Sequence, residues 1–403
     1  MAALLLALPV GYRVREFSAT LAAMPPQLET VCPHRPPCPG CPRFGEFGIA
    51  CAAHDALAEL TRTHGLPEIT VVSGKTAGFR MRARLAIRGR LNSPKIGLFE
   101  IGTHRVVHIP NCIVQHPLIN RVASIVRRAL VDCRVTSYSD AAHLGVARYL
   151  QVVVERRSQT AQVVLVANSR TAEPLAASLD LIRERLGSAL HSLWLNFNFA
   201  HTNTILGPEF LHWCGPESVV EHFGGAAVHY PPGAFGQNNL DIAERIIEHV
   251  RAQIPEGARV TEFYAGVGAI GLSVLDQVSE IKMNEVSSAS LHGLELGLDA
   301  LDPPTRAKIT IVPGPAGAAR PAATGAQVVI ADPPRKGLDS ELTQYLSQHP
   351  PERLLYVSCA LESFINDTAR LTSQRGLRLT ALAAFNLMPF TEHVETVARF
   401  ERA

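Results

Sequence analysis

The run Arg259-Val-Thr-Glu-Phe-Tyr264-Ala-Gly266-Val-Gly268-Ala-Ile-Gly271-Leu272 decides the fold of this chain. It reads as a strand, a G-x-G-x-x-G loop and the start of a helix, the order that a nucleotide-binding turn requires. Ile281-Lys-Met-Asn-Glu285 then supplies a second strand, which ends in a carboxylate 19 residues after Gly266. A carboxylate at that place can accept hydrogen bonds from ribose hydroxyls. The pattern predicts an α/β domain that binds an adenosine cofactor, either nicotinamide dinucleotide or S-adenosylmethionine.

Two further apolar runs are typical of buried strands in the same sheet. Gln327-Val-Val-Ile-Ala331 precedes Asp332-Pro-Pro-Arg-Lys-Gly337, and Leu354-Leu-Tyr-Val-Ser358 precedes Cys359. Ligands of open α/β sheets bind at the carboxyl ends of the strands, so we expect Asp332 and Cys359 at that edge. A thiol with a carboxylate nearby suits attack on an electron-poor carbon, although a lone cysteine is more often a small core hydrophobe.

Length and composition indicate a globular protein of two or three domains. The chain has 403 residues, of which 47% are hydrophobic and 18% charged, so it has ample material for a core. The net charge of +2 permits a nucleic-acid partner without arguing for one. The apolar opening Met1–Val10 lacks the charged start of a signal peptide and is too short to span a bilayer. We expect it to be a strand or a frayed terminus of a cytoplasmic protein.

The cysteines are bunched in a way that indicates a metal centre. Cys32-Pro-His-Arg-Pro-Pro-Cys38-Pro-Gly-Cys41 has the spacing C-x5-C-x2-C, with Cys51 next and Cys112 far downstream. Thiolates are the soft ligands that zinc and iron–sulfur clusters select. Three close ligands and a distant fourth are common for a cluster, whereas Cys32, Cys38, Cys41 and Cys51 (or His34) would make a zinc knuckle. Spacing alone leaves the metal open.

The region before the nucleotide-binding turn reads as a mixture of helices and strands. Helical periodicity marks Cys51–Leu60, and alternating β-branched runs cover 69–72, 150–155, 161–167 and 192–197. Arg80, Arg82 and Arg84 share a parity, so a strand would place them on one face. Such a stripe could hold phosphates of a nucleic acid or could be a solvated sheet face.

The motifs together resemble one enzyme family. Asp332-Pro-Pro at a strand end resembles the signature of S-adenosylmethionine-dependent methyltransferases that act on nucleic-acid bases, and Arg335 narrows the resemblance to the RNA uracil-5-methyltransferases. The remaining motifs of that family recur in order along nearly the whole chain: Phe235-x-Gln237-x-Asn239, the Tyr264 loop, Val357-Ser-Cys359 and His393-Val-Glu395.

This resemblance implies a role for each site residue. It implies that S-adenosylmethionine contacts Gln237, Tyr264, Glu285 and Asp332. Cys359 would be the nucleophile and Glu395 the base, with His393 orienting the last loop or serving as an ordinary histidine. The resemblance to the branch that methylates 23S rRNA implies a [4Fe-4S] cluster, which favours Cys112 over Cys51 and iron–sulfur over zinc. Its four ligands would be Cys32, Cys38, Cys41 and Cys112.

The expected architecture has three parts. Residues 1–55 would carry the iron–sulfur loop, 56–225 a central RNA-binding α+β domain, and 226–403 a Rossmann-like class I methyltransferase domain. Three departures from the family stand out: Ala360-Leu361 replaces Asn-Pro after the nucleophile, Ala269 replaces a polar residue, and no room precedes Cys32 for an oligonucleotide-binding barrel.

The expected activity is formation of 5-methyluridine in 23S rRNA by a monomeric enzyme with an RNA partner and no membrane. The alternatives are a tRNA uracil-5-methyltransferase, a non-catalytic RNA-binding factor, and a nicotinamide-dependent oxidoreductase with an iron–sulfur centre. Only the methyltransferase reading uses the Asp-Pro-Pro turn and the paired thiol and carboxylate.

Overall fold

The computed structural model describes residues 31–374 and 376–403. Residues from Cys32 to Ala403 form one compact unit, distinct from the segment that ends at Val31. The expectation of a strand or frayed terminus at Met1–Val10 lies outside the described residues. No helix in the described part of the chain is long and apolar enough to cross a membrane.

An eight-stranded sheet carries the predicted nucleotide-binding turn. Its order is β1-β16-β17-β15-β14-β11-β12-β13, and β17 alone runs antiparallel to its neighbours. The strands are β1 (Thr70–Val72), β11 (Ala258–Phe263), β12 (Val278–Glu285), β13 (Ile309–Pro313), β14 (Val328–Ala331), β15 (Arg353–Ser358), β16 (Leu377–Phe385) and β17 (Glu395–Arg402). The Rossmann-like α/β fold is therefore confirmed.

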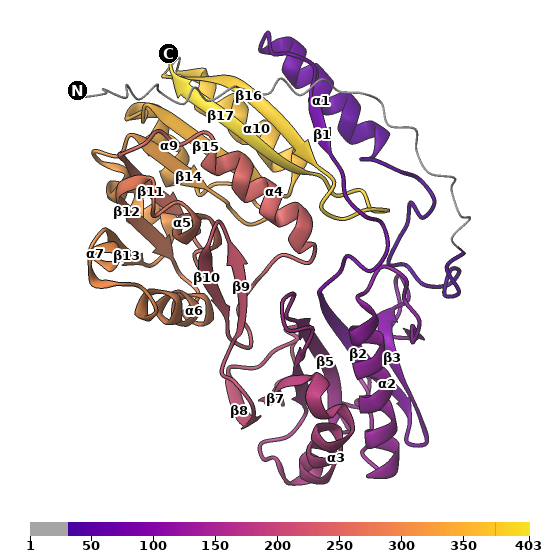
Figure 1. Ribbon diagram of the computed structural model, residues 1–403. Helices are drawn as coiled ribbons and strands as arrows, with labels where there is room; N and C mark the ends of the chain where they lie inside the picture. The colour runs from indigo at the N-terminus through magenta and orange to yellow at the C-terminus, as the bar shows by residue number, and fades with distance from the viewer. Residues whose placement is uncertain (1–30, 375) are drawn as a thin grey trace, which may run out of the picture. The chain divides into compact units, whose positions relative to one another are not determined.

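Helices cover both faces of this sheet, as Figure 1 shows. Side chains of a strand alternate between faces, and β15 follows the rule: Leu355 and Val357 enter one core, Leu354 and Tyr356 the other. Such burial on both faces explains the continuous apolar runs of the sequence. The helices are α1 (Cys51–Thr63), α4 (Leu240–Arg251), α5 (Ala269–Ser273), α6 (Ser288–Asp299), α7 (Pro303–Arg306), α8 (Ala316–Ala319), α9 (Ser340–Gln348) and α10 (Leu361–Ser373), with a 3-10 turn at Arg320–Ala323.

A seven-stranded, mainly antiparallel sheet forms the central region. Its order is β4-β3-β2-β5-β6-β7-β8, and α2 and α3 pack on one face of it. The elements are β2 (Arg82–Arg90), β3 (Ser93–Phe99), β4 (Val106–His108), α2 (Pro117–Asp132), β5 (Ala147–Val154), β6 (Ala161–Ala167), α3 (Ala176–Leu186), β7 (Leu190–Phe197) and β8 (Glu209–Cys214), with 3-10 turns at Glu173–Leu175 and Gly187–Ala189. The hairpin of β9 (Val219–Phe223) and β10 (Ala226–Tyr230) leads from this sheet to α4.

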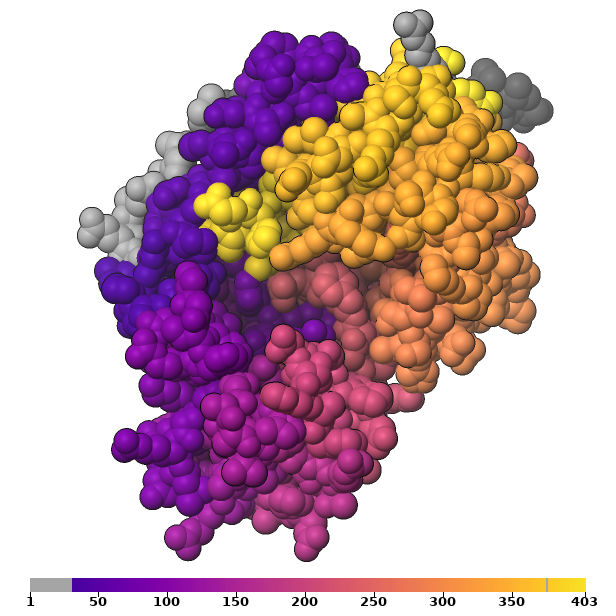
Figure 2. Space-filling view, turned by 180° about the vertical axis from the view of Figure 1, so that it is seen from behind, coloured from indigo at the N-terminus to yellow at the C-terminus, as the bar shows by residue number. Residues whose placement is uncertain are grey.

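One segment differs from the expected division of the chain. The sequence analysis placed residues 56–72 in the central domain, but β1 pairs with β16 and so extends the eight-stranded sheet. The α1 residues Ala53 and Leu57 join the same core as Leu377 and Leu379 of β16. Figure 2 shows α1, in indigo, beside the yellow C-terminal segment. The cysteine loop is thus followed directly by elements that pack on the nucleotide-binding sheet.

Candidate active site

The predicted site residues follow strands that end in register. Phe263, at the end of β11, pairs with Asn284 of β12 and with Ala331 of β14. Ala331 in turn pairs with Tyr356 of β15, two residues before the strand ends. Tyr264, Glu285, Asp332 and Cys359 stand at or directly after these carboxyl ends. The topology therefore gathers them at the sheet edge where ligands of such folds bind.

Glu395 reaches the same edge from the opposite direction. It begins β17, which runs antiparallel to β15 with Ser358 opposite Thr396. Cys359 follows Ser358 just as Glu395 precedes Thr396, so the two residues continue this ladder at its end, and the charge of Glu395 acts on the Cys359 thiol. The Glu395 side chain is 4% exposed, and its Oε1 atom has no hydrogen-bond partner among the described residues. A buried carboxyl oxygen without a partner is costly, and functional sites are where proteins bear that cost.

Burial and mutual repulsion control the protonation of these groups. Burial raises the pKa of Asp332 to about 7. Burial, and secondly the charge of Asp332, raises the pKa of Glu395 well above its ordinary value. Burial, followed by the charges of Glu395 and Asp332, raises the pKa of Cys359 to about 11. The thiol is therefore protonated near neutral pH. A positively charged ligand beside the two carboxyls and the thiol would favour the ionised form of each group.

The cofactor side of the edge offers hydrogen-bond acceptors. Glu285 Oε2 accepts from the Gly266 amide at 2.8 Å, and its Oε1 accepts from the amides of Val286 and Ser287. The carboxylate is thereby fixed at the mouth of the G-x-G-x-x-G loop. Tyr264 has a φ of 60°, a left-handed conformation that costs energy for a non-glycine residue, and its hydroxyl accepts from the Asp339 amide at 3.0 Å.

Gln237 lies on the loop before α4. Asn239 caps that helix, and its Nδ2 donates to the Leu387 carbonyl at 3.1 Å. The contact ties the loop to the segment that leads to Glu395. No hydrogen bond in the described part of the chain joins the Gln237 side chain itself to the strand edge.

Two carboxyls of the site escaped the sequence analysis. Glu262 is 1% exposed within β11, and burial together with the charges of Asp332 and Glu285 raises its pKa well above the ordinary value. Asp367 of α10 is 3% exposed and accepts from the Leu338 amide at 2.9 Å and the Tyr356 hydroxyl at 2.7 Å. An acid inside an apolar strand could have identified Glu262 from the sequence. The role of Asp367 could not be predicted, because it depends on a contact between distant segments.

The turn after the nucleophile is held differently from the family pattern. Ser358 Oγ bridges to the amide and carbonyl of Ala360, each at 3.3 Å. Ala360 is the N-cap of α10 and provides no side-chain cap. On the facing loop, His393 is exposed and contacts Arg335 at 3.3 Å between Nε2 and Nη2. His393 thus joins the last loop to the Asp-Pro-Pro-Arg turn.

The four cysteines predicted as ligands line one cavity. Cys32, Cys38, Cys41 and Cys112 all face it, together with Arg80, while Cys51 is exposed at the start of α1. Burial, and secondly the charge of Cys112, raises the pKa of Cys41 to about 11, although the positive charge of Arg80 opposes the shift. Within residues 31–374 and 376–403, no three His, Cys, Asp or Glu side chains converge closely enough to hold a single metal ion.

Arg82 and Arg84 lie on β2 and Arg80 just before it, and two of these three arginines are largely covered. Arg80 lines the cysteine cavity, and its Nε is buried without a partner. Arg82 lies over the Tyr230 ring at 4.1 Å, and its Nη2 is buried without a partner. Arg84 is exposed and donates to Gln151 at 2.7 Å. The solvated-face interpretation is wrong for Arg80 and Arg82, because β9–β10 and the cysteine loop cover them.

The fold and the strand edge define a nucleotide-cofactor enzyme of the methyltransferase type, and comparisons with known proteins identify the family. Residues 324–403 match the family model of tRNA (uracil-5-)-methyltransferases. An RNA methyltransferase of Protochlamydia amoebophila, itself uncharacterized, is 35% identical over 92% of this chain and 97% of its own length. An uncharacterized RNA methyltransferase of Geobacter sulfurreducens is 27% identical over 84% of this chain and 69% of its own.

A solved structure shares the fold. The Pyrococcus abyssi tRNA (uracil-54, C5)-methyltransferase, solved with S-adenosyl-L-homocysteine, superposes with a TM-score of 0.71 at 22% identity, over 87% of this chain and 83% of that one. The chain belongs to the RNA uracil-5-methyltransferase family and is an RNA methyltransferase.

Proposed function

We propose that this protein transfers a methyl group from S-adenosylmethionine to carbon 5 of a uridine in RNA. The observation that carries the proposal is the buried, unpartnered carboxyl of Glu395, whose charge acts on the Cys359 thiol at the edge where the strands end. A nucleophile and a base on adjacent antiparallel positions suit a reaction that must add a thiol to a base and then remove a proton.

The residues at the strand edge fit the cofactor. Glu285 is placed to accept hydrogen bonds from the ribose, since it stands at the end of β12 beside Gly266. Asp332 and Glu262 are buried acids whose charge a sulfonium would stabilise. Gln237 and Tyr264 complete the set that the family resemblance implies. When bound, S-adenosylmethionine supplies an electrophilic methyl group.

Cys359 activates the target base. Carbon 5 of uracil is a weak nucleophile, and addition of the thiolate at carbon 6 produces an enolate in which carbon 5 can attack the methyl group. The bond between that methyl and the donor's sulfur breaks as the new carbon–carbon bond forms. Glu395 then takes the carbon-5 proton, and the thiolate leaves as the double bond returns. A stacked base cannot reach the thiol, so the uridine must be unpaired or flipped out.

The substrate we favour is 23S rRNA. The cysteine set that resembles the rRNA-methylating branch lines one cavity here, which supports that choice. Transfer RNA is the second candidate, because the matching family model and the P. abyssi structure are both described as tRNA methyltransferases.

The cysteine cavity fits a [4Fe-4S] cluster better than a single ion. A single ion needs its ligands to converge on one point, whereas a cluster occupies the space between its thiolates. Cys32, Cys38, Cys41 and Cys112 would hold it. Its role would be structural, since methyl transfer needs no redox step. The cysteine loop contacts the segment that leads to Glu395. The Arg43 amide donates to the Phe390 carbonyl at 3.0 Å, and the Phe44 ring lies 5.0 Å from the Phe390 ring.

A covalent trap tests the chemistry. RNA that contains 5-fluorouridine should form a stable adduct with the protein and S-adenosylmethionine, because fluorine cannot leave as a proton does. Cys359→Ala should abolish the adduct, and Cys51→Ala serves as a matched control that should retain it. Methylation of carbon 5 by Cys359→Ala would overturn the mechanism.

A second experiment assigns the base and the substrate. Glu395→Gln should form the thiol adduct with natural RNA and accumulate it, because elimination stalls. Mass spectrometry of nucleosides from separated rRNA and tRNA of a deletion strain should show 5-methyluridine missing from rRNA. Its loss from tRNA alone would select the second candidate.

A further inference from the structure

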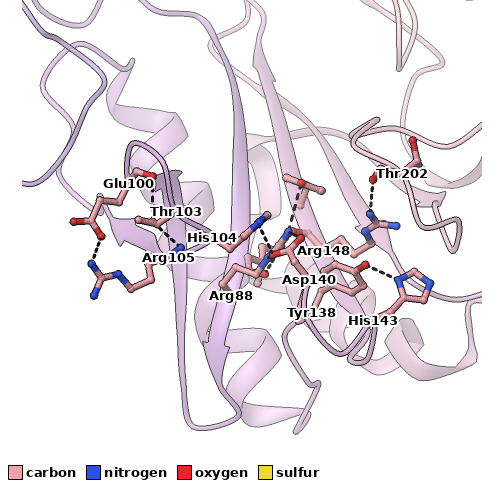
Figure 3. A network of polar contacts seen from close by, with 12 residues as sticks. Arg88, Glu100, Thr103, His104, Arg105, Tyr138, Asp140, His143, Arg148 and Thr202 are labelled. Carbon is pink, nitrogen blue, oxygen red and sulfur yellow. Dashed lines mark hydrogen bonds and ion pairs between the residues drawn. The ribbon is translucent and has the colours of Figure 1, made fainter.

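A cavity in the seven-stranded sheet takes no part in the proposed chemistry. It has a volume of about 560 Å³, within the range of small-molecule sites, and none of its lining residues belongs to the strand edge or the cysteine loop. Three segments form it: the end of β2, the 137–141 loop and the 201–203 loop, with His104 from the hairpin between β3 and β4. Figure 3 shows the polar contacts around it.

Two buried arginines connect the segments that line the cavity. Arg88, 6% exposed, donates to both oxygens of Asp140 at 2.6 and 2.8 Å and lies 5.0 Å from the ring of Tyr138. Arg148, 2% exposed, packs over the other side of the network at 4.4 Å from the Tyr138 ring and donates to the carbonyls of Asn198, Ala200 and Thr202. Burying guanidinium groups is costly unless each is well paired. Arg88 therefore holds the 137–141 loop through Asp140, and Arg148 holds the 198–202 segment through its carbonyls.

The surface that these loops present is polar, aromatic and nearly neutral. The charges of Arg88 and Asp140 cancel, and the Asp140 side chain is 24% exposed with lone pairs left beyond its two bonds to Arg88. The His201 ring lies 4.9 Å from the His143 ring at a tilt of 52°. The His104 side chain is 83% exposed, and its Nδ1 lies 4.0 Å from Asp140 Oδ2. Among the described residues, the side chains of His201 and Asn203 make no hydrogen bond. These two side chains can therefore hydrogen-bond to a ligand without breaking a contact of the protein.

We propose that this cavity binds an unpaired nucleotide of the substrate RNA outside the reaction centre. Single-stranded bases are recognised by stacking on aromatic and imidazole rings and by hydrogen bonds along their edges. His104 and His201 supply the rings, Asp140 accepts an N–H of the base, and Asn203 can donate or accept. The balanced charge suits a base rather than a phosphate. The proposal rests on the proposed function only in taking RNA as the substrate.

The test separates RNA binding from methyl transfer. The triple variant His104→Ala, His201→Ala, Asn203→Ala leaves both buried arginines in place. Its affinity for a transcript of large-subunit rRNA, and for an unmodified tRNA transcript in parallel, should fall about tenfold or more, as loss of base stacking predicts. Affinity for S-adenosylmethionine should stay unchanged, and kcat at saturating RNA should change much less than KM. The control is the double variant Arg183→Ala, Glu184→Ala, whose two residues belong to α3 and do not line the cavity. It should bind RNA as the wild type does.

Photocrosslinking places the contact directly. A transcript that carries 4-thiouridine should crosslink to peptides that contain His104 or residues 201–203, and the triple variant should lose these crosslinks while keeping those near Cys359. Unchanged RNA affinity of the triple variant, or crosslinks confined to the strand edge, would overturn the proposal. If 5-methyluridine never forms but the triple variant still loses RNA affinity, the proposed function fails and this inference stands.

Discussion

At the scale of single residues, the surroundings of Cys359, the proposed nucleophile, keep its thiol protonated. Burial is the largest cause of the high pKa of Cys359, and the charge of Glu395 is the second. Removing that charge in Glu395→Gln should lower the pKa and speed alkylation of Cys359 by iodoacetamide at pH 8 by roughly 3- to 10-fold. Peptide mass mapping separates Cys359 from the exposed Cys51, whose alkylation rate is the internal control. An unchanged rate at Cys359 would mean that the charge of Glu395 does not raise the pKa of the thiol.

Asp332 predicts a pH dependence of cofactor binding. Burial raises its pKa to about 7, so it is half protonated at neutral pH without a cofactor. A sulfonium favours the carboxylate, so the affinity for S-adenosylmethionine should rise by about fivefold from pH 6 to pH 7, reach about tenfold at pH 8 and level off above it. S-adenosylhomocysteine has no positive sulfur and should show a flatter profile. Calorimetry at the three pH values measures both; parallel slopes for the two ligands, or a slope retained in Asp332→Asn, would contradict the assignment.

At the scale of elements, α10 begins without a cap directly after the nucleophile. Ala360 has an extended conformation and no side-chain hydrogen bond to the first turn. Ala360→Asn restores the family residue and can accept a hydrogen bond from that turn, so the free energy of unfolding should rise by about 1 kcal/mol. Urea unfolding measures the gain, and Ala360→Gln, whose longer side chain caps poorly, is the control. Equal stability of the two variants would show that the Ser358 bridge already satisfies the turn.

The loop after Asp332 depends on one buried acid. Asp367 of α10 accepts from the Leu338 amide and the Tyr356 hydroxyl, and a side chain at Gly337 would clash with it. Asp367→Ala leaves two buried donors unpaired and should cost about 2–5 kcal/mol, more than Tyr356→Phe, which removes only one of the two bonds. Chemical denaturation of both variants measures the difference. A larger loss in Tyr356→Phe would place the stabilisation in the tyrosine's own packing.

Sequence patterns predicted where the strands lie better than which segments pair with them or cover them. Long apolar runs between Gly and Pro residues placed β6, β14 and β15 within a residue or two, because burial on both faces leaves little else such runs can do. The three-residue β1 carries no signal for the strand it joins. Parity predicts one face for Arg82 and Arg84 of β2, but whether that face is covered depends on segments far away in the chain.

At the scale of the whole molecule, contacts distant in sequence converge on the segment before Glu395. The Phe390 carbonyl accepts from the Arg43 amide, the Leu387 carbonyl accepts from Asn239, and Met388 packs against Arg80. The cysteine loop, the Gln237 loop and the end of the catalytic sheet therefore share one support. The proposed cluster would act on the proposed active site through this arrangement, because disorder in the cysteine loop would loosen the segment that precedes Glu395.

The cluster can be tested through this support. Protein purified without oxygen should be brown and hold close to four irons, a number set by the [4Fe-4S] composition. Cys112→Ser should lose iron and colour, because Cys112 lines the cavity with the three loop cysteines, whereas Cys51→Ser should keep both. Hydrogen exchange should quicken across 386–394 in Cys112→Ser and stay as in the wild type in Cys51→Ser. Stoichiometric zinc in anaerobic protein, or loss of iron in Cys51→Ser with Cys112→Ser unaffected, would show that a different set of ligands and a different metal hold the loop.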